Sequence, residues 1–136
     1  MQLNLTLAAV DLEKTEQFYH EILLLTPEFI QNPSAEDSYL LLIIGTMKVV
    51  FQRLQEVEMQ HPALLQNLTR SALGVGIQLE ISCDNLDDIY RRVNHFHWPV
   101  AYELEDQEHQ RRELWLQDPN GYLVVLNEEK SSLESL

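Results

Sequence analysis

The stretch NLTLAAVDLEK, residues 4–14, decides the fold because its pattern returns as QLEISCDNLDD at residues 78–88. Each copy begins with apolar side chains that alternate with more polar ones, which is the two-residue period of a half-buried β-strand. Each copy then passes through an acidic or amide residue, Asp11 or Asn85, into an amphipathic segment. The two copies are 74 residues apart (85 − 11). We therefore expect one structural unit that occurs twice.

Helical spacing follows each of these strands. Asp11 and Asn85 are residue types that cap helix amino termini, and we expect both side chains to do so. The apolar residues after each cap recur every three or four positions and predict a stripe that packs on the apolar face of the preceding strand. The stripes are Leu12, Thr15, Phe18, Tyr19, Ile22 and Leu23 in the first copy, and Leu86, Ile89, Tyr90 and Val93 in the second.

Three further strands are predicted after each helix, near residues 28–31, 39–44 and 47–52, and near residues 99–104, 112–117 and 122–127. The last pair is joined by DPNG at residues 118–121, which places proline and glycine where a tight turn needs them. We expect one domain over residues 1–128, with module 1 at 1–54, a linking helix within 55–73 and module 2 at 74–128. Residues 129–136 are expected to form a flexible tail.

Composition narrows the classes of partner. Nine basic against 22 acidic residues give a net charge of −13, which disfavours nucleic acid and anionic membrane surfaces. The same charge either attracts cationic small molecules or serves only solubility. The chain shows no apolar run of membrane-spanning length, no signal-peptide pattern and a single cysteine, Cys83. We therefore expect a cytoplasmic protein.

Two segments carry a family resemblance. VDLEKTEQFY at residues 10–19 and DPNGY at residues 118–122 resemble the vicinal oxygen chelate superfamily, which groups glyoxalase I, bleomycin-resistance proteins and extradiol dioxygenases. The resemblance implies an α+β fold in which two tandem βαβββ modules form a curled mixed sheet around a ligand cleft, with the helices outside. It also implies a homodimer, with exchange of modules between chains as one arrangement.

The positions that hold metal in this superfamily differ here. The resemblance places a histidine on the first strand of each module and a glutamate on the last, and these positions are Asn4, Gln78, Val50 and Val125 in this chain. Amide oxygens are weak, neutral ligands and valine offers none. We expect no metal, no cofactor and no catalytic residue at these positions. His95, His97 and Cys83 are interpreted as packing or surface residues.

Strand alternation predicts the wall of the cleft. One face of the predicted strands carries Asn4, Thr6, Ala8, Val50, Gln52, Gln78, Glu80, Ser82, Leu123 and Val125. Either Trp115 or Leu114 also points into the cleft from the strand at 112–117, because a bulge near residues 120–121 would decide which of them faces inward. We assign Trp115 to the cleft. Such a mixed surface suits a small organic ligand, and Glu80 favours a cationic one.

Three functions are compatible with these observations. The first is a metal-free protein that binds or sequesters a small molecule. The alternative is a metal-dependent lyase, isomerase or dioxygenase with a displaced metal site. The third is a regulatory module whose cleft is vestigial. The sequence does not identify the ligand.

Overall fold

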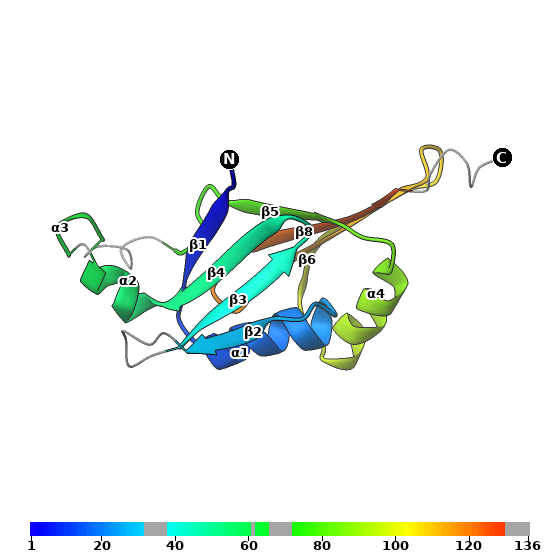
Figure 1. Ribbon diagram of the computed structural model, residues 1–136. Coiled ribbons are helices and arrows are strands. Elements are labelled where there is room, and N and C mark those ends of the chain that lie inside the picture. Colours follow the sequence, from blue (N-terminus) through cyan, green and yellow to red (C-terminus); the bar gives the residue numbers. More distant parts are fainter. Residues whose placement is uncertain (32–37, 61, 66–71, 130–136) are drawn as a thin grey trace.

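The computed structural model describes residues 1–31, 38–60, 62–65 and 72–129 (Figure 1). The first repeat is a strand, a helix and three strands. The helix begins as an α-helix and continues without a break as a π-helix, η1. Its elements are β1 (Asn4–Ala9), α1 (Leu12–Gln17), η1 (Phe18–Ile22), β2 (Glu28–Gln31), β3 (Ser38–Ile44) and β4 (Met47–Arg53).

The second repeat has the same order of elements. It contains β5 (Gln78–Ser82), α4 (Leu86–His95), β6 (Val100–Asp106), β7 (Arg111–Gln117) and β8 (Leu123–Glu129). Two short helices, α2 (Leu54–Gln60) and α3 (Pro62–Leu65), stand between the repeats. Pro62 opens α3, where its missing N–H costs no hydrogen bond. Parts of the predicted linker, which include His61, and most of the predicted tail lie outside the described residues. Pro33 lies outside them as well.

The strands form two separate four-stranded sheets with matching topology. Their orders are β1-β4-β3-β2 and β5-β8-β7-β6. The pairs β1·β4 and β5·β8 are parallel, and the remaining pairs are antiparallel. The prediction of an α+β fold with two βαβββ modules is confirmed, and the sheets are open. Figure 1 shows α1 and α4 side by side below the sheets, in agreement with the contacts between η1 and α4.

The core runs through both modules without interruption. Every residue of the first predicted stripe is buried, and so are Leu86, Ile89 and Val93 of the second. They pack with the apolar faces of both sheets in one hydrophobic cluster. Full burial of a side chain of this size contributes about 1.5–3 kcal/mol. The two modules therefore stabilise each other through shared apolar contacts.

The two helix caps differ, and one prediction is wrong. Asp11 Oδ1 accepts a 2.9 Å hydrogen bond from the Lys14 N–H, as expected. Asn85 precedes α4 but its side chain makes no capping bond. Its backbone (φ −122°, ψ 32°) lacks the extended conformation that Asp11 has (φ −143°, ψ 109°) and that capping requires. Glu128 Oε2 on β8 accepts from the Leu86 N–H instead, at 3.2 Å.

The carboxyl end of α4 closes in a Schellman motif. The Trp98 N–H donates to the Val93 carbonyl at 3.0 Å, and the His97 N–H donates to the Asn94 carbonyl at 3.3 Å. This motif requires a residue in the left-handed conformation just after the helix. His97 is that residue, with φ 53°. A histidine therefore occupies a position that favours glycine.

Candidate functional site

The turn at residues 118–121, here called the junction turn, carries the most buried polar groups of module 2. Asp118 is 4% exposed. Its Oδ1 accepts hydrogen bonds from the backbone N–H groups of Asn120 (2.8 Å) and Tyr122 (3.0 Å). Its Oδ2 accepts from the hydroxyl of Tyr19 at 2.8 Å. The sequence predicted a tight turn, and the structure shows that the turn also binds the helix of module 1.

Two more side chains tie the junction turn to module 1. Asn120 Oδ1 accepts from the Val10 N–H at 2.8 Å, and its Nδ2 donates to Thr15 Oγ1 at 3.0 Å. The Tyr122 hydroxyl donates to the Ala8 carbonyl at 2.8 Å. The junction turn therefore fixes module 2 on the strand-to-helix connection of module 1.

The titration of these groups follows from their burial. Burial raises the pKa of Asp118, while the donors around its carboxylate oppose that change. Burial raises the pKa of Tyr19 well above its usual value, and the neighbouring Asp118 charge adds to this effect. The Tyr19 proton is therefore held firmly on its oxygen. This arrangement suits a structural hydrogen bond, since a group that retains its proton is a poor general acid or base near neutral pH.

The predicted cleft residues of module 1 share one face of its sheet. In the parallel register Asn4 is opposite Lys48, Thr6 is opposite Val50, and Ala8 is opposite Gln52. Ala8 is buried and Asn4 is exposed. Gln52 Oε1 accepts a 3.1 Å hydrogen bond from Gln60 Nε2, so α2 contacts this face at the Gln52 end.

The predicted residues of module 2 also share one face. Gln78, Glu80 and Ser82 on β5 are opposite Leu123, Val125 and Asn127 on β8. Asn127 links two of them, because its Nδ2 donates to Glu80 Oε1 at 2.7 Å and its Oδ1 accepts from Ser82 Oγ at 3.0 Å. The Glu80 carboxylate is therefore oriented on this surface.

Trp115, and not Leu114, lies on the same face. Trp115 is opposite Val125, whereas Leu114 is fully buried on the other side of β7. The Trp115 ring is 5.1 Å from that of Tyr102 in an edge-to-face arrangement. Its Nε1 donates to Glu113 Oε2 at 3.0 Å. The face therefore combines two aromatic rings with an acid.

Sequence reasoning missed Tyr102, Glu113 and Asn127 as members of this surface. Tyr102 meets Trp115 only because the register shifts between Val100 and Tyr102. The plain alternation of a strand does not reveal such a shift. Asn127 and Glu113 lie two residues along their strands from Val125 and Trp115, so they share the same face of the sheet. Continuing the alternation by two residues on each strand would have included them.

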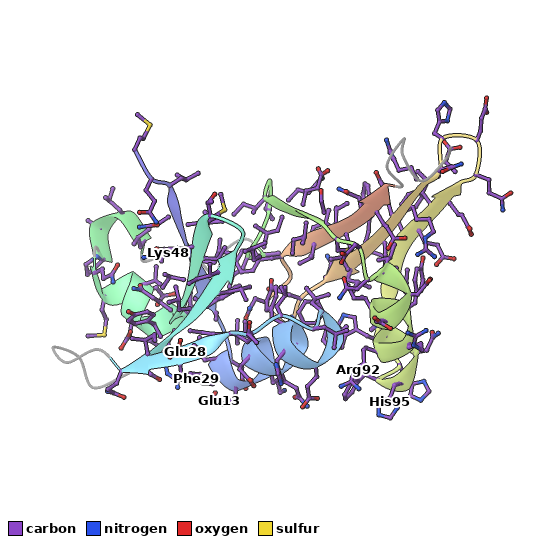
Figure 2. The ribbon with its side chains drawn as sticks, turned by 45° about the vertical axis from the view of Figure 1, so that its right-hand side comes forward. Glu13, Glu28, Phe29, Lys48, Arg92 and His95 are labelled. Atoms are coloured by element: carbon purple, nitrogen blue, oxygen red, sulfur yellow. The ribbon has the colours of Figure 1, made fainter. Side chains whose placement is uncertain are left out.

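The four positions that the resemblance assigns to metal ligands carry no carboxylate or imidazole. They offer two amides, Asn4 and Gln78, and two side chains without a ligand atom, Val50 and Val125. Asn4 is also directly opposite the lysine Lys48, labelled in Figure 2, so positive charge lies beside it. Elsewhere in the part of the chain that the structure describes, no cluster of three His, Cys, Asp or Glu side chains is arranged to hold a metal. These four side chains therefore lack the donors that usually hold divalent ions in proteins.

A cavity of about 340 Å³ lies between the modules. Module 2 contributes Gln78 and Glu80, and module 1 contributes apolar side chains that include Leu5, Val49 and Phe51. Alternation places Val50 and Gln52 on the opposite face of that sheet. Within one chain, the cavity thus brings two of the predicted residues together with the apolar face of module 1. The binding role of the predicted residues stays a prediction.

The chain resembles known proteins both in sequence and in fold. Residues 2–126 match the model of the Glyoxalase/Bleomycin resistance protein/Dioxygenase superfamily. The chain therefore belongs to this superfamily, as the resemblance implied. No curated protein matches.

Solved structures confirm the fold. A lactoylglutathione lyase from Agrobacterium tumefaciens is similar at 17% identity and a TM-score of 0.63, over 94% of this chain and 92% of that one. A virulence protein from Salmonella typhimurium is similar at 19% identity and 0.64, over 96% of both chains. A superfamily member from Sphaerobacter thermophilus is similar at 16% identity and a TM-score of 0.65, over 95% of this chain and 97% of that one. At these identities the likeness concerns the fold alone.

Proposed function

We propose that this protein is a metal-free binding protein of its superfamily, which sequesters a small organic molecule without transforming it. One observation supports the proposal: the positions that the resemblance assigns to the metal ligands of the superfamily's enzymes carry Asn4, Val50, Gln78 and Val125 in this chain. A divalent ion needs several carboxylate or imidazole ligands, and this set supplies none. The fold is retained while the donors are absent, which favours binding over catalysis.

The chemistry of the module 2 face supports a cationic or aromatic ligand. Tyr102 and Trp115 form a pair of rings, and the carboxylate of Glu80 lies on the same face, whereas that of Glu113 is paired with Arg111 at 2.7 Å. Ring faces attract cations by about 0.5–2 kcal/mol, and Glu80 adds Coulombic attraction. The net charge of −13 acts in the same direction.

A homodimer in the cytoplasm is part of the proposal. Within one chain the cavity between the modules uses the apolar face of the first sheet, so its polar face is directed elsewhere. A second copy would bring that polar face opposite the module 2 face of its partner. Among the described strands β1 pairs with β4 alone and β5 with β8 alone, which leaves one edge of each for such contact. No helix in the described ranges is long and apolar enough to cross a membrane.

Calorimetry tests the proposal. Purified protein is titrated with a cationic glycopeptide antibiotic of the bleomycin class and with a panel of aromatic amines. We expect saturable binding that Glu80→Gln and Gln78→Ala weaken about tenfold, the effect of losing roughly 1.4 kcal/mol of contact. Glu108→Gln is the matched control, because it removes an acid at the exposed tip of the β6–β7 hairpin. Unchanged affinity in both cleft variants would contradict the proposal.

Elemental analysis separates this function from the enzymatic alternative. We expect the purified protein to contain no stoichiometric metal, and its melting temperature to be the same with and without a chelator. A tightly held metal with loss of turnover on its removal would support a lyase, isomerase or dioxygenase instead. Analytical ultracentrifugation tests the dimer separately, so that its failure leaves the binding result interpretable.

A further inference from the structure

A second concave surface lies on the helical side of the molecule, away from the residues of the proposed cleft. One wall is a stripe of the α1–η1 helix, Lys14, Gln17, Phe18, Glu21 and Ile22, whose spacing of three, four, seven and eight places them on one helix face. The other wall is Phe96, Trp98 and Pro119 from module 2. This helical groove has a volume of about 450 Å³.

The aromatic walls of the helical groove are fixed in place. The Trp98 ring is 5.1 Å from that of Phe18, and its Nε1 donates to the Gln117 carbonyl at 2.9 Å. The Schellman motif at the end of α4 sets the direction of the chain between Phe96 and Trp98. Binding therefore requires little ordering of these side chains, which reduces its entropic cost.

A bridge from α4 holds the two walls together. Arg92, labelled in Figure 2, donates from Nε to the Glu21 carbonyl, and its guanidinium lies 5.2 Å from the centre of the Phe96 ring. The contact joins η1 to α4 and pairs the guanidinium with an aromatic face. The helical groove is thus a built junction between modules, a place where small-molecule sites frequently occur.

Opposite charges stand at the two ends of the helical groove. Lys14 and Glu21 both line the groove and are seven residues apart on the continuous α1–η1 helix, so their backbone positions differ by roughly 10 Å or slightly less along its axis, because the π-helical part rises less per residue than an α-helix. The Glu21 carboxylate accepts a long 3.4 Å hydrogen bond from Gln17 Nε2, which lies between the two charges. The groove wall therefore presents a cation and an anion about two helical turns apart, opposite the aromatic residues of module 2, with the Arg92 guanidinium held against Phe96 beside Glu21.

We propose that the helical groove is a second ligand site, which binds a flat aromatic molecule about 10 Å long with an acidic group at one end and a basic group at the other. Phe96 and Trp98 cover the rings, with Trp98 backed by the buried Phe18, while Lys14 binds the anionic end and Glu21 binds the cationic end. The volume lies within the 300–1,000 Å³ typical of small-molecule sites. The site shares no residue with the proposed cleft and does not depend on the function proposed for it.

The probe is 4′-(aminomethyl)biphenyl-4-carboxylate, with 4-biphenylcarboxylate, 4-(aminomethyl)biphenyl and neutral biphenyl-4-carboxamide for comparison. Calorimetry measures affinity, and the emission of Trp98 in a Trp115→Phe background reports the location. We expect the doubly charged probe to bind at least about fivefold more tightly than each singly charged one, which corresponds to one exposed ion pair of about 1 kcal/mol. Binding should change the emission of Trp98.

Charge reversal gives the decisive comparison. Lys14→Glu and Glu21→Lys should each weaken binding of the doubly charged probe by about tenfold or more, because each places a like charge against one end. The double reversal should restore affinity, since the probe then binds end for end. Glu28→Gln, on β2 outside the helical groove and labelled in Figure 2, is the control and should have no effect.

Two results would overturn the proposal. The first is affinity that does not distinguish the doubly charged probe from the neutral amide. The second is affinity unchanged by both single reversals in variants whose circular dichroism spectra match the parent. Glu80→Gln should leave probe binding unaltered, so failure here is distinguishable from failure of the proposed cleft.

Discussion

The Tyr19 hydroxyl, on the helix of module 1, donates a 2.8 Å hydrogen bond to Asp118 Oδ2, on the junction turn of module 2. The two residues are 99 positions apart in the chain, and both are buried. Asp118 also receives two backbone N–H groups from its own turn. One carboxylate thereby fixes the shape of the turn and its position on the other module.

Removing this carboxylate should destabilise the whole chain. Asp118→Ala leaves the Tyr19 hydroxyl and two backbone N–H groups without their acceptor, which costs about 2–4 kcal/mol of unfolding free energy. Tyr19→Phe removes one partner and should cost about 1 kcal/mol. Urea denaturation measures both. Because the residues share a bond, the double variant should cost less than the sum of the single ones, and strict additivity would contradict the coupling.

Alkaline stability should depend on Tyr122. Burial and the Asp118 charge raise the pKa of Tyr122 to about 12, so the folded state keeps the phenol proton more firmly than the unfolded chain. Its contribution is complete below pH 10 and is lost as the pH rises from 10 to about 12. Tyr122→Phe should lower stability by about 1 kcal/mol at pH 7, through the lost bond to Ala8, and flatten the decline above pH 10. Denaturation curves at pH 7, 10 and 11.5 test this, and an equally steep decline in the variant would refute the assignment.

Gly74 should be intolerant of a side chain. A Cβ at this position would lie 2.8 Å from Tyr122 Cδ1 and 3.0 Å from the Gly121 carbonyl oxygen, and φ is +85°. Gly74→Ala should therefore cost about 2–3 kcal/mol through overpacking and backbone strain together. Gly45→Ala is the matched control, because its φ is +59° and nothing lies within 4 Å of the added Cβ. That variant should lose only about 1–2 kcal/mol. Equal losses in thermal denaturation would show that the contact with Tyr122 has no effect.

The left-handed residue at the end of α4 offers a stabilising change. His97→Gly removes the steric cost of φ 53° and keeps both Schellman hydrogen bonds, which use backbone atoms. We expect a gain of about 1 kcal/mol in unfolding free energy. His95→Gly, two residues earlier at the last position of α4, should lose about 0.5–1 kcal/mol, because the backbone there is helical and glycine is less favourable in a helix. A loss in both variants would show that His97 makes a favourable contact with its side chain.

Local signals in the sequence predicted most of the fold. The prolines at 27 and 33 predicted a strand near residues 28–31, where β2 lies, and helical spacing identified every buried residue of the α1–η1 stripe. These features succeed because each depends on neighbours within a few positions. The Asn85 cap failed for the complementary reason, because the backbone angles at Asn85 are not encoded in its residue type.

Long-range partners could not be predicted in the same way. The sequence identified the DPNG turn, but nothing near residues 118–122 indicates that Asn120 meets Val10 or that Tyr122 meets Ala8. The pairing of Tyr102 with Trp115 likewise depends on a register shift in β6. The face shared by Gln78, Glu80 and Ser82 followed from parity alone. Their part in ligand binding awaits the titrations described above.

Two of the hydrogen bonds that tie the junction turn and Tyr122 to module 1 end on main-chain atoms. Asn120 contacts the amide of Val10, and Tyr122 contacts the carbonyl of Ala8, groups that nearly every amino acid supplies. The exposed side chains of the first strand, such as Asn4, can consequently differ without breaking either of these two bonds. An attachment of this kind keeps the two halves joined while residues on the exposed side of the first strand change.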